Sequence, residues 1–350
     1  MTAKLPRQSN IELLRMVAMF LVLLVHADFF SLGSPTISDI QTDTIDSFFK
    51  ILFESISIVC VNVFVLISGW FGIKPSYKGI LNFLFQCIFF LTGLYIITNI
   101  IGVNTLSLKG LAGCVFATKL NWFIKAYLLL YIISPVLNHF VNNTSQKEFK
   151  YILFGFFLFT CTYGWIGAAE FMMQGYSTIS FIGLYLLARY IRIYSPAWSK
   201  LHIKYDIAIY LSTIIIVSAL TFTPPLYLGV KIPLNFYSYI SPTTIIGAVY
   251  LLLAFSKISI QSKFINWCGV SCFAVFLIHV SPSTLWHYKD LFVKLHDSLP
   301  TLEYWGATFI ILTGIFIIAI LIDKVRIAIW EICWNKIFRN IEPVITNIIK

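Results

Sequence analysis

The chain has 350 residues, of which 59% are hydrophobic and only 11% are charged, and its formal net charge is +10. A soluble globular domain carries charge on roughly a quarter of its residues, so this chain has too little polar material to cover a water-facing surface. The composition therefore excludes a soluble enzyme, a nucleic-acid-binding protein and a disordered protein, and it predicts an integral membrane protein. Because the apolar runs are long and unbroken, we expect helices and not a barrel.

Ten segments are apolar over the length of about 20 residues that a membrane-spanning helix needs. In chain order they are residues 11–30, 49–70, 80–101, 120–138, 151–168, 176–194, 206–223, 236–256, 264–284 and 303–323. The eighth segment contains Pro242, which we expect to kink its helix. The sequence thus predicts an all-α fold, a polytopic helical membrane protein with about ten transmembrane helices in one bundle.

The basic residues favour one orientation of this bundle. With the N-terminus in the cytoplasm, 17 of the 25 Lys and Arg residues fall on the cytoplasmic side, 7 fall outside and Arg15 lies within the membrane. Cytoplasmic loops of membrane proteins are enriched in Lys and Arg, so we expect both termini in the cytoplasm and the protein in the inner (plasma) membrane. The excess of basic residues then contacts the anionic lipid headgroups of the bilayer, and we expect no nucleic-acid partner.

The chain divides into a transmembrane domain, residues 1–325, and a short tail, residues 326–350. Apolar and basic residues alternate in the tail, which predicts an amphipathic helix on the cytoplasmic face of the membrane. The spacing of the seven cysteines does not indicate a set of disulfide bonds. We therefore expect each cysteine to be a small, buried, hydrophobic side chain. Cys268, Cys272 and His279 can face one way, but they lack a fourth ligand, and we expect no metal site.

The first predicted span carries most of the polar residues that a membrane helix would avoid, namely Glu12, Arg15, His26 and Asp28. Arg15 and His26 are eleven positions apart, which places them about 20° apart around a helix and roughly 16 Å apart along it. Glu12 precedes Arg15 by three residues and can neutralise part of its charge. Ionisable groups inside spans mark functional sites by default. The alternative from spacing alone is a structural ion pair and a hydrogen-bonded histidine.

Four stretches of sequence carry a resemblance to a known family. They are Ile11–Arg15 followed after ten residues by His26, the segment Val63–Phe71 with Ser68-Gly69, the segment Asn121–Ile124 with Ser134-Pro135 after it, and Phe273–His279. In this order they resemble the motifs of acyltransferase family 3, over residues 10 to about 325. Some members of that family carry an Arg-x-x-Arg pair after the Ser-Gly segment. Lys74 and Lys78 occupy that loop here, so no arginine role is carried over.

The resemblance implies a membrane O-acyltransferase whose transmembrane domain is of the acyltransferase family 3 type. Such an enzyme moves an acyl group, often acetyl, from a coenzyme A donor to a hydroxyl of a sugar or lipid. It implies no bound cofactor, with acetyl-CoA or another acyl-CoA as donor substrate. The expected acceptor is a cell-surface polysaccharide or its lipid-linked precursor, which makes a glycan or glycolipid the second partner.

The residue types fit acyl transfer. A hydroxyl needs a base in the transition state, and the ordinary pKa of histidine near 6.5 suits His26 to that role. Arg15 lies near the cytoplasmic end of its span, where it could bind the donor phosphates together with Lys74 and Lys78. We assign catalysis to His26 and Arg15. The supporting residues are Glu12, Ser68, Trp122 and His279.

Two further interpretations concern single side chains. For His279 we expect a hydrogen bond to another helix, or a place along the acceptor cavity. Glu54 could orient a histidine, but we expect it to pair with Lys50 four residues earlier.

Two other functions fit an integral membrane protein of this composition. A secondary transporter or glycan flippase would place Arg15 and His26 along a substrate or proton path. Transporters more often show paired, Gly- or Pro-broken helices in corresponding halves, which the sequence does not show. A sensor or scaffold has no positive feature in the sequence.

The distribution of basic residues generates a topology prediction. Reporter domains fused at Lys200 and within the Ser31–Ser47 loop should fall on opposite sides of the membrane, because an odd number of predicted spans separates them. Alkaline phosphatase and fluorescent-protein fusions measure this directly. The same side for both reporters would contradict the ten-span topology.

Overall fold

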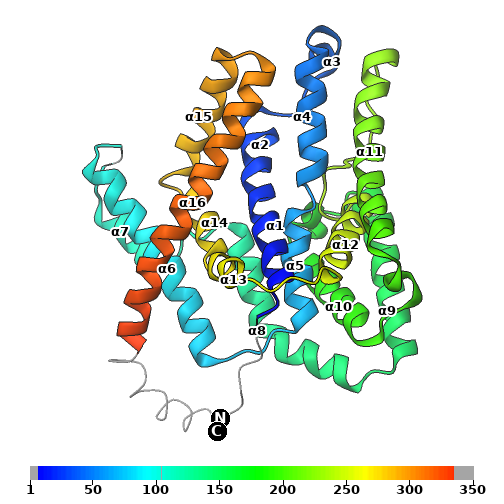
Figure 1. Ribbon diagram of the computed structural model, residues 1–350, viewed down its shortest axis with the longest axis horizontal. Coiled ribbons are helices and arrows are strands. Elements are labelled where there is room, and N and C mark those ends of the chain that lie inside the picture. Colours follow the sequence, from blue (N-terminus) through cyan, green and yellow to red (C-terminus); the bar gives the residue numbers. More distant parts are fainter. Residues whose placement is uncertain (1–6, 104, 335–350) are drawn as a thin grey trace.

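The structure, a computed structural model, describes residues 7–103 and 105–334, and this part of the chain is an all-helical bundle (Figure 1). The α-helices are α1 (Ser9–Ala27), α2 (Phe29–Leu32), α3 (Ile37–Thr42), α4 (Thr44–Ser57), α5 (Cys60–Phe71), α6 (Tyr77–Ile100), α7 (Leu108–Val115), α8 (Trp122–Asn143), α9 (Gln146–Phe159), α10 (Thr178–Tyr194), α11 (Ile203–Leu228), α12 (Pro242–Ser256), α13 (Lys263–Gly269), α14 (Cys272–His279), α15 (Leu285–Ser298) and α16 (Thr301–Cys333). A π-helical turn, η1 (Thr160–Ile166), and two 3-10 turns, η2 (Glu170–Gly175) and η3 (Ala197–Lys200), complete them.

Each of the ten predicted spans overlaps one of these helices, so the polytopic bundle is confirmed. Seven helical stretches are long and apolar enough to cross a membrane: Ser9–Leu32, Thr44–Phe71, Tyr77–Ile100, Trp122–Asn143, Gln146–Ile166, Ile203–Leu228 and Thr301–Cys333. The other three predicted spans correspond to shorter helices, α10, α12 and the pair α13–α14. The protein is therefore a multi-pass membrane protein.

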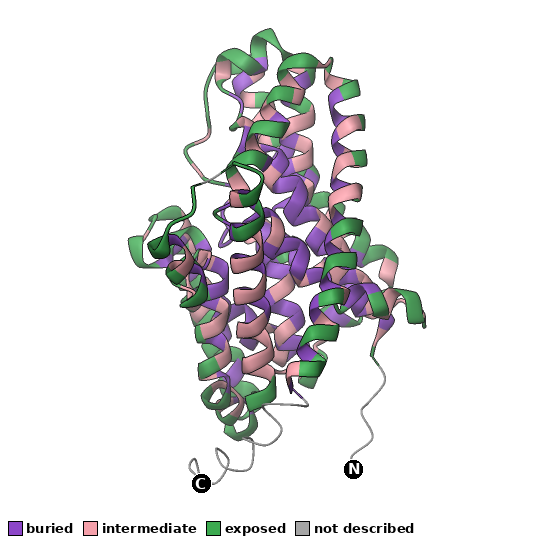
Figure 2. Ribbon diagram, turned by 90° about the vertical axis from the view of Figure 1, so that its left-hand side faces the viewer, coloured by how far each residue is buried: buried purple, intermediate pink, exposed green. Residues whose placement is uncertain are grey.

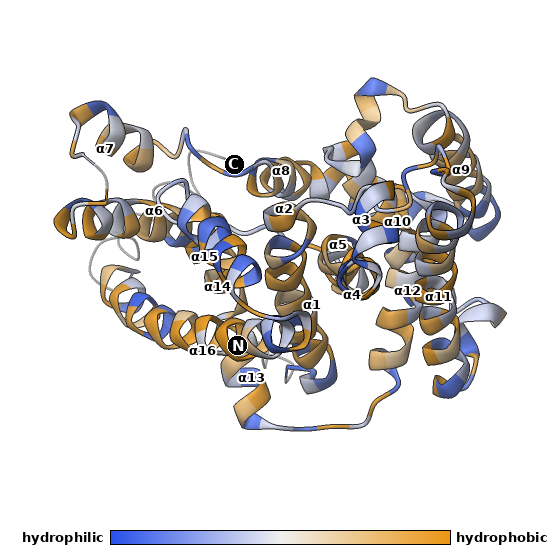
Figure 3. Cartoon of the chain, turned by 90° about the horizontal axis from the view of Figure 1, so that it is seen from above, coloured by the Kyte–Doolittle hydropathy of each residue, from blue (hydrophilic) through white to orange (hydrophobic). Residues whose placement is uncertain are grey.

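Helix α1 runs through the middle of the bundle. It packs against α4, α5, α12, α13, α14 and α16, and the view from above shows these helices around it (Figure 3). Buried residues gather along this central axis, whereas the outer helices expose much of their surface (Figure 2). The exposed side chains on the outside are largely apolar, for example Ile215 and Ile310, as expected for helices that face lipid. The polar residues of α1 are thus held away from the hydrocarbon.

Several predicted boundaries are wrong for identifiable reasons. The eighth span begins at Pro242 and not at residue 236, because proline occupies the first helical turn after Ser241, where its missing N–H costs nothing. The fourth span continues through Pro135 to Asn143. The ninth is interrupted between α13 and α14, directly after Gly269. The first and second spans are also interrupted, at Asp28 and between α4 and α5.

Helices α3, α7 and α15 and the end of α16 lie outside the predicted spans. The connection before the last span contains the amphipathic helix α15, whose Tyr288 and Phe292 are buried four residues apart. The Tyr288 hydroxyl donates to the Leu23 carbonyl at 2.6 Å, which ties α15 to α1. Helix α16 continues without a break past Asp323 to Cys333, so the predicted tail begins inside it. The rest of that tail, residues 335–350, lies outside the described residues. All seven cysteines are free thiols.

Close packing of α5 on α10 depends on Gly69. A Cβ atom built on Gly69 would lie 2.4 Å from the carbonyl oxygen of Tyr185 and 2.8 Å from Cβ of Ala188. Backbone atoms cannot move aside as a flexible side chain can. The small residue in the Ser68-Gly69 segment therefore sets the distance between the two helices.

Gly69→Ala should destabilise the protein, because the added methyl group forces α5 and α10 apart. We expect a loss of about 1–3 kcal/mol, the usual cost of overpacking a filled core, measured as a lower melting temperature in detergent. Gly306→Ala is the matched control, since a Cβ at Gly306 meets nothing within 4 Å. Equal melting temperatures for the two variants would contradict this packing argument.

Candidate active site

A cavity of about 440 Å³ surrounds His26 in the middle of the bundle. Residues beside two of the helix breaks contribute to its wall: Phe29 after α1, and Ile58 between α4 and α5. Val280, at the end of α14, contributes as well. Irregular backbone is tolerated at membrane depth only where it is buried in protein or lines a cavity. These two breaks thus lie beside the central chamber of the bundle, which we name the His26 cavity.

His26 is hydrogen-bonded to His279 across the bundle. The distance from Nδ1 of His26 to Nε2 of His279 is 2.8 Å, and Nδ1 of His279 lies 2.6 Å from the Val275 carbonyl oxygen. The helix-to-helix hydrogen bond expected for His279 is therefore confirmed.

This chain of contacts determines the tautomer of both rings. A carbonyl oxygen can only accept, so Nδ1 of His279 carries the proton and Nε2 of His279 has a lone pair. Nδ1 of His26 must then donate to it. In neutral His26 the remaining nitrogen, Nε2, is unprotonated. Since His26 lines the cavity, this lone pair is the one available to a group that enters it.

Two carboxyl groups near His26 lack an ionic partner. The buried carboxylates of the described residues are Glu12, Asp28, Asp46, Glu54, Asp206 and Asp323. All except Asp28 and Glu54 are ion-paired with a basic side chain. Both oxygens of Asp28 and Oε2 of Glu54 have no hydrogen-bond partner among the described residues.

Glu54 lines the His26 cavity, and Asp28 follows His26 by two residues. The expected pairing of Lys50 with Glu54 is wrong. Lys50 instead binds Asp46, with Nζ 2.7 Å from Oδ2, because Asp46 lies on the same side of α4 one turn earlier and also accepts from His296. Glu54 is left as an unpaired acceptor in the cavity wall.

Aromatic rings make up much of the remaining wall. Trp122 lies with its ring centroid 4.4 Å from that of Tyr176 and 6.0 Å from that of Tyr239. It stands at the first position of α8 because the Asn121 side chain accepts a hydrogen bond from the Phe123 amide at 2.9 Å and caps the helix there. Trp122 lines the His26 cavity.

Arg15 lines a second cavity, of about 300 Å³, which we name the Arg15 cavity. Glu12 binds both arginines of this region, with Oε2 2.5 Å from Nη1 of Arg15 and Oε1 3.0 Å from Nη1 of Arg7. Room for Glu12 exists because a Cβ on Gly269 would lie 2.3 Å from Oε2 of Glu12. The break after α13 thus accommodates the ion pair. Ser68 also lines this cavity, and its hydroxyl lies 3.2 Å from that of Tyr127.

Phe123 lines both cavities. Its ring centroid lies 5.3 Å from that of Phe276, an edge-on contact between α8 and α14. The two cavities are therefore neighbours along α1, with an aromatic pair between them. Arg15 and His26 share a helix but line different chambers.

The predicted site residues separate into three groups. Trp122 and His279 lie with His26, and Glu12 and Ser68 lie with Arg15. Lys74 and Lys78 are exposed and line neither cavity, and Nζ of Lys78 lies 4.7 Å from the centre of the Trp334 ring.

Sequence reasoning missed Arg7, Phe123 and Tyr127 as cavity residues. Only the position of Phe123 within the Asn121–Ile124 motif pointed to it. Within residues 7–103 and 105–334, no cluster of three or more His, Cys, Asp or Glu side chains could hold a metal ion.

Comparison with known proteins identifies the family of the chain. Residues 8–323 match a family model described as an acyltransferase domain. The chain belongs to acyltransferase family 3. Neither the curated proteins nor the solved structures include a match to it.

Membership of acyltransferase family 3 makes the protein a membrane-bound acyltransferase, which acts on an acyl donor and an acceptor. The match therefore favours an acyltransferase over the alternatives of a transporter, a flippase and a scaffold. All four stretches that carry the resemblance lie within the matched residues. Of these stretches, the first supplies Arg15 and His26 and the last supplies His279, so the family motifs line or support the two cavities.

Proposed function

We propose that the protein transfers an acetyl group from acetyl-CoA to a hydroxyl of a cell-surface polysaccharide or its lipid-linked precursor, with His26 as general base. The observation that carries this proposal is the 2.8 Å contact of Nδ1 of His26 with Nε2 of His279, which leaves Nε2 of His26 as the free nitrogen of a residue that lines the 440 Å³ cavity. A base must have its lone pair facing the proton that it removes, and the relay to Val275 supplies that orientation.

The proposed reaction is direct. The acceptor oxygen attacks the thioester carbonyl while Nε2 of His26 takes the hydroxyl proton, and the C–S bond then breaks. The coenzyme A thiolate leaves and receives that proton. During the step the Nδ1–H of the imidazolium donates to His279, so the new charge is hydrogen-bonded. An acyl-histidine intermediate is the less favoured route.

The donor is proposed to enter through the Arg15 cavity. Coenzyme A carries phosphates on one end of a long arm, and Arg15 together with Arg7 presents guanidinium groups to this chamber. Glu12 orients both and offsets part of their charge. Lys74 and Lys78, exposed at the start of α6, are proposed to contact the nucleotide outside the cavity. The thioester would pass the aromatic pair Phe123–Phe276 to reach His26.

The composition of the His26 cavity supports a sugar acceptor. Sugars present apolar ring faces and many hydroxyl groups. The rings of Trp122, Tyr176 and Tyr239 offer flat apolar surface, and the unpaired carboxyl of Glu54 offers an acceptor for a second hydroxyl. We propose further that both termini lie in the cytoplasm, so that the donor arrives from that side.

His26→Ala should abolish acetyl transfer, with a loss of roughly 10²- to 10⁴-fold in kcat. His279→Ala should lower kcat by about ten- to a hundredfold with little change in KM, because one charge-assisted hydrogen bond to the imidazolium is lost. His279→Gln keeps an acceptor and should restore part of the rate. The assay follows labelled acetyl-CoA with candidate glycans and the purified protein in detergent.

The matched control for the histidine variants is His287→Ala, an exposed histidine that lines neither cavity. It should leave kcat unchanged. Retained activity in a well-expressed His26→Ala protein would reject the general base.

Arg15→Lys should raise KM for acetyl-CoA more than it lowers kcat, because lysine keeps the charge and loses the planar fork. One charge-assisted contact of about 1.5–3 kcal/mol corresponds to a ten- to hundredfold shift. Calorimetric binding of acetyl-CoA to wild type and variant measures the affinity directly.

The alternative is that Arg15 only holds the bundle through Glu12, from which it lies 2.5 Å. In that case Glu12→Gln would damage the protein as much as Arg15→Lys. Unchanged acetyl-CoA affinity in Arg15→Lys would then remove Arg15 from the donor site.

A further inference from the structure

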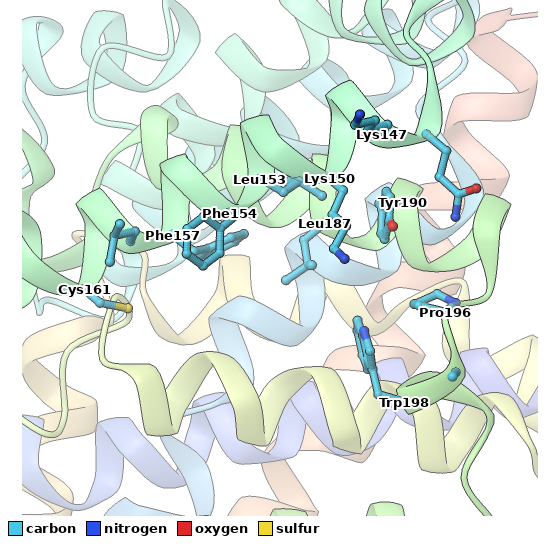
Figure 4. A pocket seen from close by; sticks show the side chains of 13 residues that line it. Lys147, Lys150, Leu153, Phe154, Phe157, Cys161, Leu187, Tyr190, Pro196 and Trp198 are labelled. Atoms are coloured by element: carbon cyan, nitrogen blue, oxygen red, sulfur yellow. The ribbon is translucent and has the colours of Figure 1, made fainter.

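A long groove lies on the outside of the bundle, away from both cavities. It has a volume of about 1010 Å³, and its walls come from α9, the end of α10 and η3. Figure 4 shows its side chains: the apolar residues of α9 lie toward one end, and the lysines lie toward the other. None of its lining residues lines the His26 or Arg15 cavity.

The apolar part of the groove lies along a helix that is long and apolar enough to cross a membrane. Leu153, Phe157 and Leu158 line it from α9, and Leu187 lines it from α10. The apolar window of the α9 span is only 22% buried within the protein, so this helix lies at the periphery of the bundle. A peripheral apolar groove within a span opens to hydrocarbon chains and not to water.

The other end of the groove is cationic. Lys147 and Lys150 line it, and neither ammonium group has an ion pair, hydrogen bond or aromatic partner in the described part of the chain. The neighbouring acid, Glu148, is engaged with Ser145, whose hydroxyl lies 2.6 Å from Oε2. The turn that precedes α9 lies at the same end of the bundle as the beginning of α1 (Figure 1). With both termini in the cytoplasm, as proposed above, these lysines lie at the level of the inner-leaflet headgroups.

The two ends match an amphiphile in length and charge. Lys147 and Leu158 are eleven residues apart on α9, which corresponds to about 16 Å along the helix axis. That is about half of the hydrocarbon thickness of a bilayer, the depth that one leaflet provides. A groove with two unpaired cations at the headgroup level and an apolar floor below them is complementary to an anionic lipid.

We propose that this groove binds one anionic glycerophospholipid of the surrounding leaflet, with its phosphate between Lys147 and Lys150 and an acyl chain along Leu153, Phe157 and Leu158. Tyr190 lines the same groove and, among residues 7–103 and 105–334, its hydroxyl makes no hydrogen bond, so it is available to the headgroup. The proposal is independent of the acyl-transfer reaction.

Native mass spectrometry of delipidated protein in detergent, titrated with palmitoyl-oleoyl phosphatidylglycerol, tests the site. Wild type should bind one copy more tightly than it binds the phosphatidylcholine of the same chains. Lys147→Gln/Lys150→Gln should weaken phosphatidylglycerol binding by roughly thirtyfold, since each basic residue near the headgroup contributes about a factor of five. Lys204→Gln/Lys263→Gln, which removes two exposed lysines outside the groove, is the matched control and should bind as wild type does.

A second variant tests the apolar half. Leu158→Trp fills the groove at an exposed position that tolerates substitution, and it should weaken phosphatidylglycerol binding with both lysines intact. Glycerol phosphate, which has the headgroup without chains, should not displace the lipid.

Equal binding of both lipids by wild type, unchanged binding by the lysine double variant, or displacement by glycerol phosphate would overturn the proposal. A dimer that dissociates on the same substitutions would assign the groove to a second copy of the chain and would overturn it as well.

Discussion

A helix that carries an arginine and a histidine through the apolar part of a membrane protein must be enclosed by other helices, and this requirement organises the bundle around α1. Each polar group of α1 meets a partner from another element or from its own turn. Arg15 meets Glu12, and His26 meets His279 on α14. Buried residues gather around α1, and the outer helices carry many exposed apolar side chains (Figure 2). Satisfying the polar groups of one helix therefore determines which helices lie at the centre.

The breaks within the spans also lie around α1. Two spans break beside the His26 cavity, after α1 and between α4 and α5, and the third break, after α13, lies beside the Arg15 cavity. A regular helix would have filled this volume with its own side chains. Gly269, at the end of α13, leaves room for the Glu12 side chain because it has no Cβ atom. His279, at the end of α14, forms the hydrogen bond with His26. The helix breaks of these spans thus lie in the interior, where they line the two cavities.

The buried carboxyl groups are of two kinds: some are ion-paired with a basic side chain, and others have no such partner. Asp206 and Asp323 are fully buried, and each forms an ion pair with a basic side chain. A buried charge without such a partner would be strongly destabilising. Asp28 and Glu54 are equally buried and have no such partner. Unpaired buried carboxyl groups are unfavourable for stability, so their presence beside His26 supports the acceptor role that we propose for this cavity. Phe123 and Phe276 keep this region apart from the arginines.

The local pattern of the sequence determined the membrane class, the ten helical regions and the placement of Arg15 and His26 on one helix face, because hydropathy and the 3.6-residue repeat act within a single segment. The family motifs likewise identified acyl transfer without any knowledge of packing. The interruptions within spans were missed, since a run such as 264–284 is apolar throughout and composition does not record a break inside it.

Only the tertiary structure decided the site itself. His26 and His279 are 253 residues apart in the chain, and their hydrogen bond depends on how α1 and α14 cross. The ion pair of Lys50 with Asp46 left Glu54 unpaired, because two carboxyl groups within reach competed for one ammonium group. The division into two cavities at Phe123 arises in the same way. These features depend on distances between helices, which the sequence of each helix does not contain.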